Sequence, residues 1–507
     1  MEAETKRTLV QELLRQGILL SSETADADFL SHEALRGRGD VVYFHPDAIP
    51  FLENNPEIDW LAFENARACL EKNKDISLYS RVLSSPQKTS SVRVITSYTE
   101  DSAKKEVSDF VLYFNARYTA LQKVLAQRTD LSKATSISRL ISKEDREPAA
   151  IIGIVTEKET TKNGNIVLTI EDPTGQTKAL INKTKPDLFR EAKDIVLDEI
   201  IGLSGIKGNN ILFVNNLLWP DVPAANTIRK CKDGGYALFI ADLHVGSNQF
   251  LGEDFRRFID WINLRAGSAA QKEIAEKVRY IFIVGDLVDG VSVYPGQENE
   301  LTIKDVIEQY NECARLLSQI PSHIKLVICP GNHDALRLAE PQPAFYREFS
   351  EAIFSLPNAV LVSNPSVVNI HSGADFSGYN VLLYHGYSFD YYAANVDSIR
   401  NNGGYDRADL IMKFLLRRRH LAPTHTSTVY VPYNYDPLVI DPVPDFFVSG
   451  HIHKSAVAHY RGVTLICASC WQGKTSFQEK VGHNPEPSRV PAVNLATREI
   501  KILRFGQ

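Results

Sequence analysis

Hydrophobic and polar residues follow different periods along the chain, and the changes of period divide the sequence. In residues 1 to about 75, Leu9 with Leu13 and Val10 with Leu14 are apolar pairs at i, i+4 spacing, and Gly17 is a helix-stop signal. This spacing predicts a small helical N-terminal domain over 1–75. Residues 76–91 are serine-rich and unpatterned, which predicts a linker.

A long helix is predicted next, around residues 103–128. Its apolar side chains lie on one face at helical spacing. They are Val107, Phe110, Val111, Phe114, Tyr118, Leu121 and Leu125.

Alternating, strand-like runs replace the helical period between residues 150 and 182. Asn163-Gly164 is a hairpin signal and Asp172-Pro173-Thr174-Gly175 is a turn signal, so three strands are expected here. A short helical stretch and two further strands follow, over 185–196, 198–208 and 209–219. Three meandering strands, a helix and two strands is the order of an OB barrel. We therefore expect an OB-fold β-barrel domain over 92–222.

Barrels of this kind often bind single-stranded nucleic acid, but many are scaffolds. The predicted strands show few exposed aromatic–basic pairs of the kind that stack bases, which favours the scaffold role. The segment NNLLWPDV, 215–222, leaves little room for a flexible linker, so the barrel and the following domain are expected to form one rigid body.

Apolar strand-like runs alternate with helical stretches from about residue 235 onward, which predicts an α/β sandwich over 235–507. The stretch EDFRRFIDWINL places Phe255, Phe258, Ile259 and Ile262 on one helical face. The stretch KDVIEQYNECARLL does the same for its own apolar side chains. These are Val306, Tyr310, Cys313 and Leu317.

Five apolar runs in this half end in side chains that bind metals. The runs are YALFIADLH, YIFIVGDLVDG, KLVICPGNHD, NVLLYHGYS and DFFVSGHIH. Ligands gather beyond the carboxyl ends of strands in α/β sheets, so the five ends are expected to meet. The candidate ligands are Asp242, His244, Asp286, Asn332, His385, His451 and His453. Gly285, Gly331 and Gly450 each precede one of them and allow a sharp turn.

The donor set indicates which metals would bind. Neutral imidazoles with hard carboxylates suit Mn²⁺, Fe²⁺ or Zn²⁺ better than Ca²⁺. Seven ligands are too many for one tetrahedral site and fit two metals that share a carboxylate. We therefore expect two divalent ions, with Mn²⁺ preferred over Mg²⁺, Fe²⁺ and Zn²⁺, and phosphoester chemistry.

Composition limits the classes of function. The chain has 507 residues and a net charge of −6, which argues against gripping nucleic acid by bulk electrostatics. The densest basic run, KFLLRRRH at 413–420, is either a solvated helix face or a phosphate contact. No apolar stretch approaches ~18 residues and no secretory signal is evident, so a cytoplasmic protein without a membrane span is expected. Cys467 and Cys470 are expected to be incidental buried thiols rather than a redox pair or half a zinc site.

The order D-x-H, GD-x-x-D, GNHD, an isolated His and GH-x-H closely resembles the calcineurin-like metallophosphoesterase superfamily. The resemblance implies that Asp286 bridges two metals, that His333 is the catalytic histidine, and that Asp334 orients His333. Asp289 is expected to be structural. The implied first-metal ligands are Asp242, His244, Asp286 and His453, and those completing the second are Asn332, His385 and His451.

A barrel ahead of such a domain is similar to the B-subunit family of replicative DNA polymerases. Stretches such as DFVLYFNARYTAL, LLRRRHLAPT and VPDFFVSGHIHKSAVAHYRGV resemble its archaeal form, the small subunits of D-family DNA polymerases. Eukaryotic members have lost metal ligands, whereas this chain keeps every one. CASCWQ, 467–472, departs from the expected Asn, Ser, Gly or Thr residues, which bears on packing near the site.

The resemblance implies a 3′→5′ proofreading exonuclease with a two-metal site. It would act on a single-stranded or frayed DNA 3′ end at the nucleoid, bound to the large catalytic subunit of a D-family DNA polymerase. The alternative is a non-catalytic scaffold subunit with a vestigial metal site, against which the intact ligands argue. A third hypothesis, a phosphoesterase of small substrates, does not explain the barrel and the helical domain.

Overall fold

The apolar runs of the C-terminal half pair into sheets in the computed structural model, which describes residues 18–20, 41–43, 92–99, 104–373 and 375–506. A first six-stranded sheet has the order β12–β11–β10–β9–β18–β19, and β9 to β12 run parallel. Its strands are β9 (Tyr236–Ile240), β10 (Val278–Val284), β11 (Lys325–Cys329), β12 (Ala359–Leu361), β18 (Arg489–Asn494) and β19 (Ile500–Arg504).

A second six-stranded sheet has the order β16–β17–β15–β14–β13–β3, and β14 runs parallel to β15. Its strands are β3 (Val92–Thr96), β13 (Ser366–Ile370), β14 (Tyr379–Leu383), β15 (Phe446–Ser449), β16 (Ala456–Tyr460) and β17 (Val463–Cys467). The two parallel arrangements bring several strand ends of the same polarity to one edge of each sheet.

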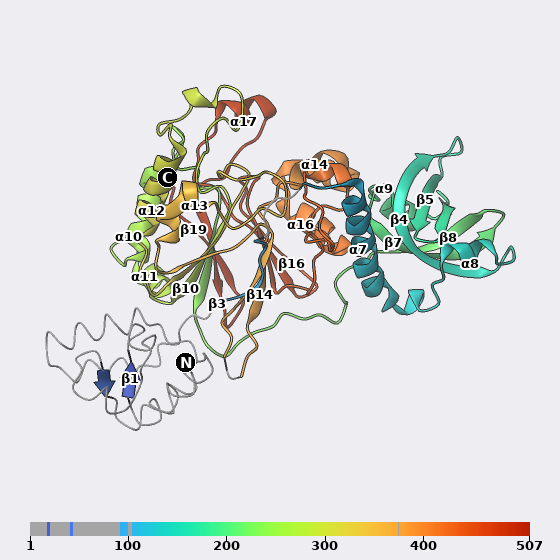
Figure 1. Ribbon diagram of the computed structural model, residues 1–507, viewed down its shortest axis with the longest axis horizontal. Helices are drawn as coiled ribbons and strands as arrows, with labels where there is room; N and C mark the ends of the chain where they lie inside the picture. Colours follow the sequence, from blue (N-terminus) through green and yellow to red (C-terminus); the bar gives the residue numbers. More distant parts are fainter. Residues whose placement is uncertain (1–17, 21–40, 44–91, 100–103, 374, 507) are drawn as a thin grey trace. The chain divides into compact units, whose positions relative to one another are not determined.

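The two sheets pack face to face between two layers of helices. Along β9, Ala237 and Phe239 point into the core shared with the second sheet, while Leu238 and Ile240 point to the helical side. In Figure 1 the helices of the first sheet and those of the second lie on opposite outer sides. They are α10 (Gly252–Ile262), α11 (Ala269–Glu276), α12 (Val306–Leu317) and α13 (Arg347–Phe354), then α14 (Phe389–Asn395), α15 (Asp397–Arg400) and α16 (Ala408–Arg418). The predicted α/β sandwich and its helix faces are confirmed.

Five strands before the sandwich close into a barrel in the order β4–β5–β6–β8–β7. They are β4 (Pro148–Thr160), β5 (Ile166–Asp172), β6 (Gly175–Ile181), β7 (Ile200–Gly208) and β8 (Ile211–Leu218). A helix, α9 (Pro186–Lys193), connects the third strand to the fourth. Shorter helices are α8 (Ile137–Ile141), before the barrel, and α17 (Ser476–Val481). The barrel has the strand and helix order predicted for an OB-type fold.

The helix predicted around 103–128 is α7 (Val107–Ala126). Its predicted apolar face is buried in the C-terminal half, at Tyr118, Leu121 and Leu125, but not in the N-terminal half. Val107 and Val111 are 80% and 54% exposed, whereas Tyr113 and Arg117 are buried. Arg117 donates to Asp436, so a buried ion pair is part of the face that this helix packs against the sandwich. A charged residue in the core cannot be recognised from hydrophobic spacing.

Strand β3 lies within the range expected for the barrel domain but pairs elsewhere. Val92–Thr96 runs antiparallel to β13 at the end of the second sandwich sheet. The sequence VRVIT signals a strand, and it carries no signal for which sheet it joins.

The barrel and the sandwich belong to one compact unit, residues 90–507. Arg418 on α16 donates to the buried Glu199 beside β7, and Trp219 donates to the same carboxylate at 3.0 Å. Arg418 and Arg419 are 2% and 4% exposed, so neither interpretation of the basic run 413–420 holds for them. The expected packing of the barrel against the sandwich is therefore present.

The predicted N-terminal helical domain, 1–75, and the linker, 76–91, lie outside the described residues except for two short segments. These are β1 (Ile18–Leu20) and β2 (Val41–Tyr43), which pair antiparallel in a separate unit, residues 1–89. Among the residues that the structure describes, none of the helices has the length and apolar character needed to cross a bilayer.

Candidate metal centre

The five strand ends that carry the candidate ligands meet at one place. Strands β9, β10 and β11 are parallel neighbours in the first sheet, and β14 and β15 are parallel neighbours in the second. The backbone N–H of His451, beyond β15, donates to Asp242, beyond β9, at 3.0 Å. The backbone N–H of His333 donates to Asp286 at 2.9 Å. The first bond joins the two sheets, the second joins neighbouring strand ends of the first sheet, and both aim the carboxylates inward.

One half of the centre contains Asp242, His244, Asp286 and His453. The Nε2 atoms of His244 and His453 are 3.1 Å apart. His453 Nε2 lies 3.5 Å from Asp242 Oδ1, and His244 Nε2 lies 3.7 Å from Asp286 Oδ2. Donor atoms of Asp242, His244 and His453 lie within 4.8 Å of one another, which is close enough for one cation.

The other half contains Asp286, Asn332, His385 and His451. Asn332 Oδ1 lies 3.0 Å from both His385 Nε2 and His451 Nδ1. His385 Nε2 lies 3.3 Å from Asp286 Oδ2. Asp286 therefore belongs to both halves, in the position required of a shared carboxylate.

Hydrogen bonds on the far side of the rings fix which nitrogen faces the centre. His385 Nδ1 lies 2.9 Å from the Val284 carbonyl oxygen, which only accepts, so this nitrogen must donate and Nε2 points inward. His244 Nδ1 bonds to the Asp289 carboxylate at 3.0 Å and is held in the same way. Asp289 therefore acts as a partner of a candidate ligand, in agreement with its predicted structural role.

The partner expected for His333 is wrong. Its Nδ1 donates to the backbone carbonyl of Asp289 at 2.8 Å, which leaves Nε2 facing the centre. The Asp334 carboxylate instead accepts from the hydroxyl of Tyr310 at 3.0 Å and from the backbone N–H of Gly331 at 2.8 Å. Asp334 thus shapes the loop that carries His333 rather than the imidazole itself.

Five of the seven candidate ligands have a left-handed backbone. Their φ angles are 52° at Asp242, 51° at His244, 52° at Asp286, 72° at His451 and 54° at His453. Each such residue costs about 1–3 kcal/mol when it is not glycine, so the surrounding structure must hold it in place. Clustered strain of this kind is typical of functional sites.

Two of the glycines noted in the sequence let the backbone approach the carboxylates. A Cβ on Gly331 would lie 2.2 Å from Asp286 Oδ1, and a Cβ on Gly450 would lie 2.5 Å from Asp242 Oδ2. Only a residue without a side chain fits at either position.

The electrostatics of the centre favour bound positive charge. Burial acts to raise the pKa of Asp286, but the imidazoles of His385 and His333 outweigh it and hold that pKa well below its ordinary value. Burial acts to lower the pKa of His385, but the Asp286 carboxylate raises it to about 10. A field that holds a proton on a buried imidazole would also hold a divalent cation, so the donor set fits the metals inferred from the sequence.

Access to the centre is from one side. Asp242, His244, Asp286 and His385 are at most 2% exposed, and Asn332, His333 and His451 are partly exposed. A phosphate group would therefore approach across these three side chains.

Several side chains that contact the candidate ligands, or Asp289 behind His244, were not found from the sequence. Asp390 Oδ2 lies 3.3 Å from His451 Nε2, and the Gln478 amide lies 3.0 Å from His453 Nδ1. The amides of Gln297 and Gln472 donate to the Asp289 carboxylate at 2.9 and 2.8 Å. Asp390 and Gln478 are on helices whose places near the centre follow from tertiary packing, and no local motif marks them.

The CASCWQ segment contributes to packing beside the centre. Cys467 and Cys470 are buried free thiols, as expected. The Trp471 ring is 1% exposed and lies edge-on to Phe255, with ring centroids 4.9 Å apart.

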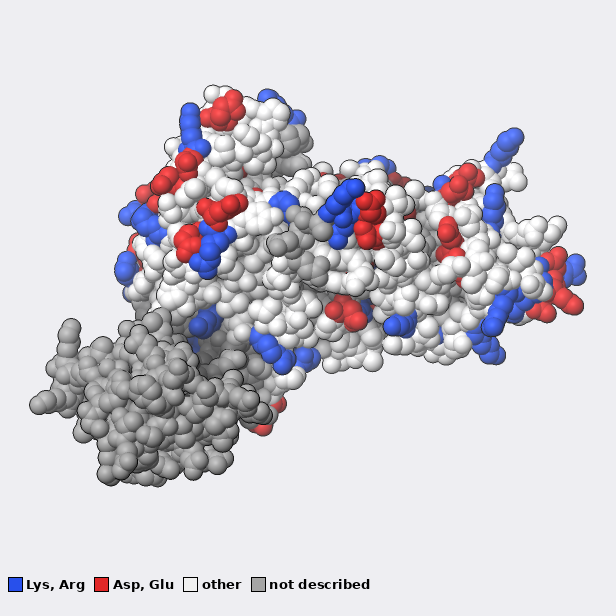
Figure 2. Space-filling view, in the orientation of Figure 1, with Lys and Arg blue, Asp and Glu red and all other residues white. Residues whose placement is uncertain are grey.

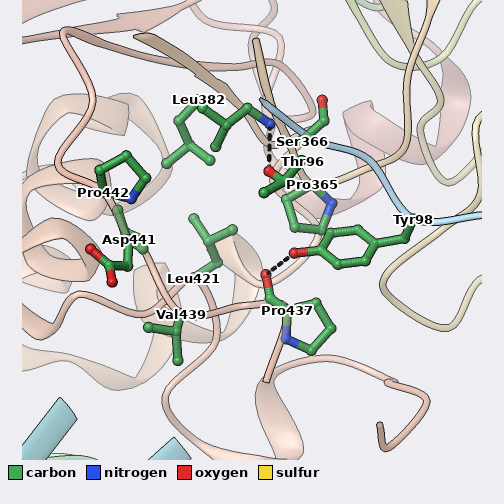
Figure 3. Close-up of a pocket in the computed structure, with 12 residues that line it drawn as sticks. Thr96, Tyr98, Pro365, Ser366, Leu382, Leu421, Pro437, Val439, Asp441 and Pro442 are labelled. Carbon is green, nitrogen blue, oxygen red and sulfur yellow. Dashed lines mark hydrogen bonds between the residues drawn. The ribbon is translucent and has the colours of Figure 1, made fainter. Parts of the chain in front are cut away.

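A small cavity lies elsewhere in the described structure and is not the substrate site. Its volume is about 30 Å³, room for about one water. Figure 3 shows Pro365, Leu382, Pro437 and Pro442 around it, with the Tyr98 hydroxyl donating to the Pro437 carbonyl at 3.4 Å. None of the seven candidate ligands lines this cavity.

Comparison with known proteins matches residues 236–455 to the calcineurin-like phosphoesterase family. The chain is 39% identical over 402 residues to the DNA polymerase II small subunit of Methanothermobacter thermautotrophicus, covering 79% of this chain and 80% of that one. It is 37% identical over 404 residues to the DNA polymerase II small subunit of Pyrococcus furiosus, of which it spans 64%. The subunit of that name from Archaeoglobus fulgidus is 35% identical over 418 residues, covering 82% of this chain and 81% of that one.

Proposed function

Since this chain belongs to the family of DNA polymerase II small subunits and carries a calcineurin-like phosphoesterase domain, we propose that it is a 3′→5′ exonuclease that proofreads DNA. The observation that carries the proposal is the complete donor set, seven side chains brought together from five strand ends with Asp286 common to both halves. A scaffold would not need the left-handed backbone at five of these seven positions.

Two divalent cations, with Mn²⁺ preferred, would be held by the two halves of the centre. Asp242, His244, Asp286 and His453 would bind one, and Asp286, Asn332, His385 and His451 the other. When bound, the cations would supply an activated water and offset the charge that develops on the phosphate.

His333 would assist the leaving oxygen. Its Nδ1 is engaged by the Asp289 carbonyl, so Nε2 is the nitrogen that faces a substrate. Burial lowers the pKa of His333, and a bound phosphodiester anion beside the ring would raise it again.

The reaction would be hydrolysis of the last phosphodiester of a DNA strand. Water adds to phosphorus, the bond to O3′ of the penultimate nucleoside breaks, and that oxygen receives a proton. The products are a 5′-mononucleotide and a strand shortened by one nucleotide with a new 3′-hydroxyl.

The charge distribution supports a subunit that works with a partner. On the face in Figure 2, acidic and basic side chains are interspersed over the described residues, without a broad basic field. Together with the net charge of −6, this favours DNA affinity supplied largely by the large catalytic polymerase subunit, in the cytoplasm.

A nuclease assay tests the proposal. The purified chain, with and without a co-expressed large subunit, is incubated with 5′-labelled single-stranded DNA and Mn²⁺. We expect a ladder of products shortened from the 3′ end, and no ladder for Asp286→Ala. Absence of any cleavage by the wild-type complex that has bound Mn²⁺ would support the alternative, a scaffold subunit with a vestigial site.

A further inference from the structure

Two tyrosines stand beside the metal centre, one next to His333 and one next to His451. The Tyr294 ring lies edge-on to the His333 ring, with centroids 6.4 Å apart. The Tyr387 ring lies 5.9 Å from the His451 ring. Both tyrosine side chains are partly exposed.

These two positions are at opposite ends of a row of contacts. The His333 ring packs on the His244 ring at 4.7 Å, and the His451 ring packs on the His385 ring at 5.2 Å. His244 and His385 both approach Asp286, which lies between them. A phosphodiester at the centre would therefore have an aromatic ring on each side.

Tyr294 belongs to a segment that buried glutamine side chains hold in place. The Gln297 amide donates to the Asp289 carbonyl at 2.8 Å and accepts from the Val293 backbone N–H at 2.8 Å. The Tyr294 hydroxyl donates to Glu300 at 3.0 Å. In the same segment, the side chains of Val291 and Val293 are 42% and 40% exposed. The His333 side of the centre thus has a fixed, apolar rim.

Tyr387 also lies on a fixed segment, two residues after His385. The neighbouring Ser388 is fully buried, and its hydroxyl donates to the Leu421 carbonyl at 2.6 Å. The backbone N–H of Ser388 donates to the Tyr384 hydroxyl at 3.2 Å. Both tyrosines are therefore positioned before any substrate arrives.

We propose that Tyr294 and Tyr387 bind the nucleobases on either side of the scissile phosphate. The proposal rests on the function proposed above. Because His333 serves the O3′ leaving oxygen, Tyr294 beside it contacts the penultimate base. Tyr387, at the other end, contacts the 3′-terminal base, which leaves with the 5′-mononucleotide.

The chemistry around the rings favours bases over backbone phosphates as ligands. Glu300 accepts from the Tyr294 hydroxyl and Asp390 contacts the His451 ring, and these two carboxylates would repel further phosphates. Stacking on an aromatic ring accepts any base, because every base has a π face. Such contacts would make the centre selective for nucleic-acid ends without sequence preference.

Three 5′-labelled oligonucleotides test the assignment: one with a normal 3′ end, one abasic at the terminal nucleotide and one abasic at the penultimate nucleotide. We expect the wild-type chain, in complex with its large subunit and Mn²⁺, to cleave each abasic substrate about 5- to 150-fold more slowly than the normal one. Tyr294→Leu should cleave the substrate that is abasic at the penultimate nucleotide as fast as the normal one, and still discriminate at the terminal nucleotide. Tyr387→Leu should show the reverse. Leucine keeps most of the side-chain volume and removes the ring.

Three further measurements serve as controls and as a second readout. Tyr294→Phe and Tyr387→Phe should retain both preferences. Tyr435 is an exposed tyrosine that stacks on Tyr433, and Tyr435→Leu should also retain them. In the His333→Ala background, which should not cleave the DNA, the affinities for the three oligonucleotides are measured by fluorescence anisotropy. The two leucine substitutions should change these affinities in the same pattern as the cleavage rates.

The outcomes separate the inference from the proposed function. Suppose that the wild type shortens normal DNA. If both leucine variants still discriminate against the two abasic substrates as the wild type does, or if each loses discrimination at the other's position, the inference is overturned and the proposed exonuclease function stands. If the wild type with bound Mn²⁺ shortens none of the three DNAs, both are overturned.

Discussion

Gly331 lies against the bridging carboxylate, and its lack of a Cβ leaves the space that Asp286 occupies. Its φ angle lies outside the left-handed region, so Gly331→Ala introduces the steric contact with Asp286 without strain in φ. We expect Mn²⁺ binding to weaken about 10- to 100-fold, as when a partner of a ligand is lost. Titration calorimetry measures this. Gly234→Ala is the matched control, since a Cβ there has no atom within 4 Å. Unchanged Mn²⁺ binding in both variants would contradict the claim that Asp286 needs the space left by Gly331.

A substitution at His333 should distinguish catalysis from metal binding. His333→Ala should lower kcat about 10²- to 10⁴-fold while the metal content stays the same, because the side chain lies beside the donors and is proposed to act on the leaving group. Asp286→Ala should lower both kcat and the metal content. Metal analysis and steady-state kinetics on the same samples distinguish the two, with the exposed His323→Ala as the control. A His333→Ala protein with full activity and normal metal content would remove the catalytic role.

The candidate ligands could be predicted residue by residue because each follows an apolar strand and a local motif. The role of His333 was implied by the family resemblance, but its partner was not predicted correctly. Whether Asp289 or Asp334 reaches the ring depends on the turn of the backbone after β11, and the sequence predicted the wrong one. Asp390 is a further example, since it contacts His451 only through the packing of α14.

At the scale of elements, helix α7 is attached to the sandwich through a buried polar cluster. Asp436 accepts from Arg117 at 2.5 Å, from the Tyr113 hydroxyl at 2.7 Å and from His420 Nε2 at 2.8 Å. His420 Nδ1 accepts from the backbone N–H of Ala422 at 2.9 Å, so the ring is neutral. Burial, and then the Arg117 charge, lower the pKa of His420 to about 4.

This neutral histidine makes stability depend on pH. Because the pKa of His420 is lower in the folded protein than its value of about 6.5 in an unfolded chain, the unfolded state binds more protons as the pH falls. The stabilisation is complete above pH ~6.5 and is lost, by about 3 kcal/mol, as the pH falls through ~4. Denaturant unfolding in EDTA at several pH values should show a shallower pH dependence for His420→Gln. The exposed His425→Gln serves as the control, and identical slopes for all three proteins would contradict the assignment.

The elements differ in how far the sequence defines them. The barrel strands could be predicted because Asn163-Gly164 and Asp172–Gly175 mark their turns. The existence of α7 could also be predicted, together with the burial of Tyr118, Leu121 and Leu125. The burial of Arg117 could not, since its charge is typical of a surface residue. Strand β3 was not predicted, and its pairing with β13, more than 260 residues away, follows only from the tertiary fold.

At the scale of the whole molecule, all described candidate ligands and the barrel lie in the unit 90–507. We therefore predict that deletion of residues 1–75 spares both nuclease activity and assembly with the large polymerase subunit. A stable complex should bury at least ~1,000 Å². Co-purification of the truncated chain with the large subunit measures this. Loss of the complex would show that the N-terminal residues are the docking element.

The central claim is that side chains from five strand ends hold two metals around Asp286, and anomalous diffraction from crystals grown with Mn²⁺ tests it most directly. The account predicts two manganese peaks, each within ~2.5 Å of its ligands and with Asp286 contacting both. The first should contact Asp242, His244 and His453, and the second Asn332, His385 and His451. A single peak, or peaks bound by other side chains, would contradict the account.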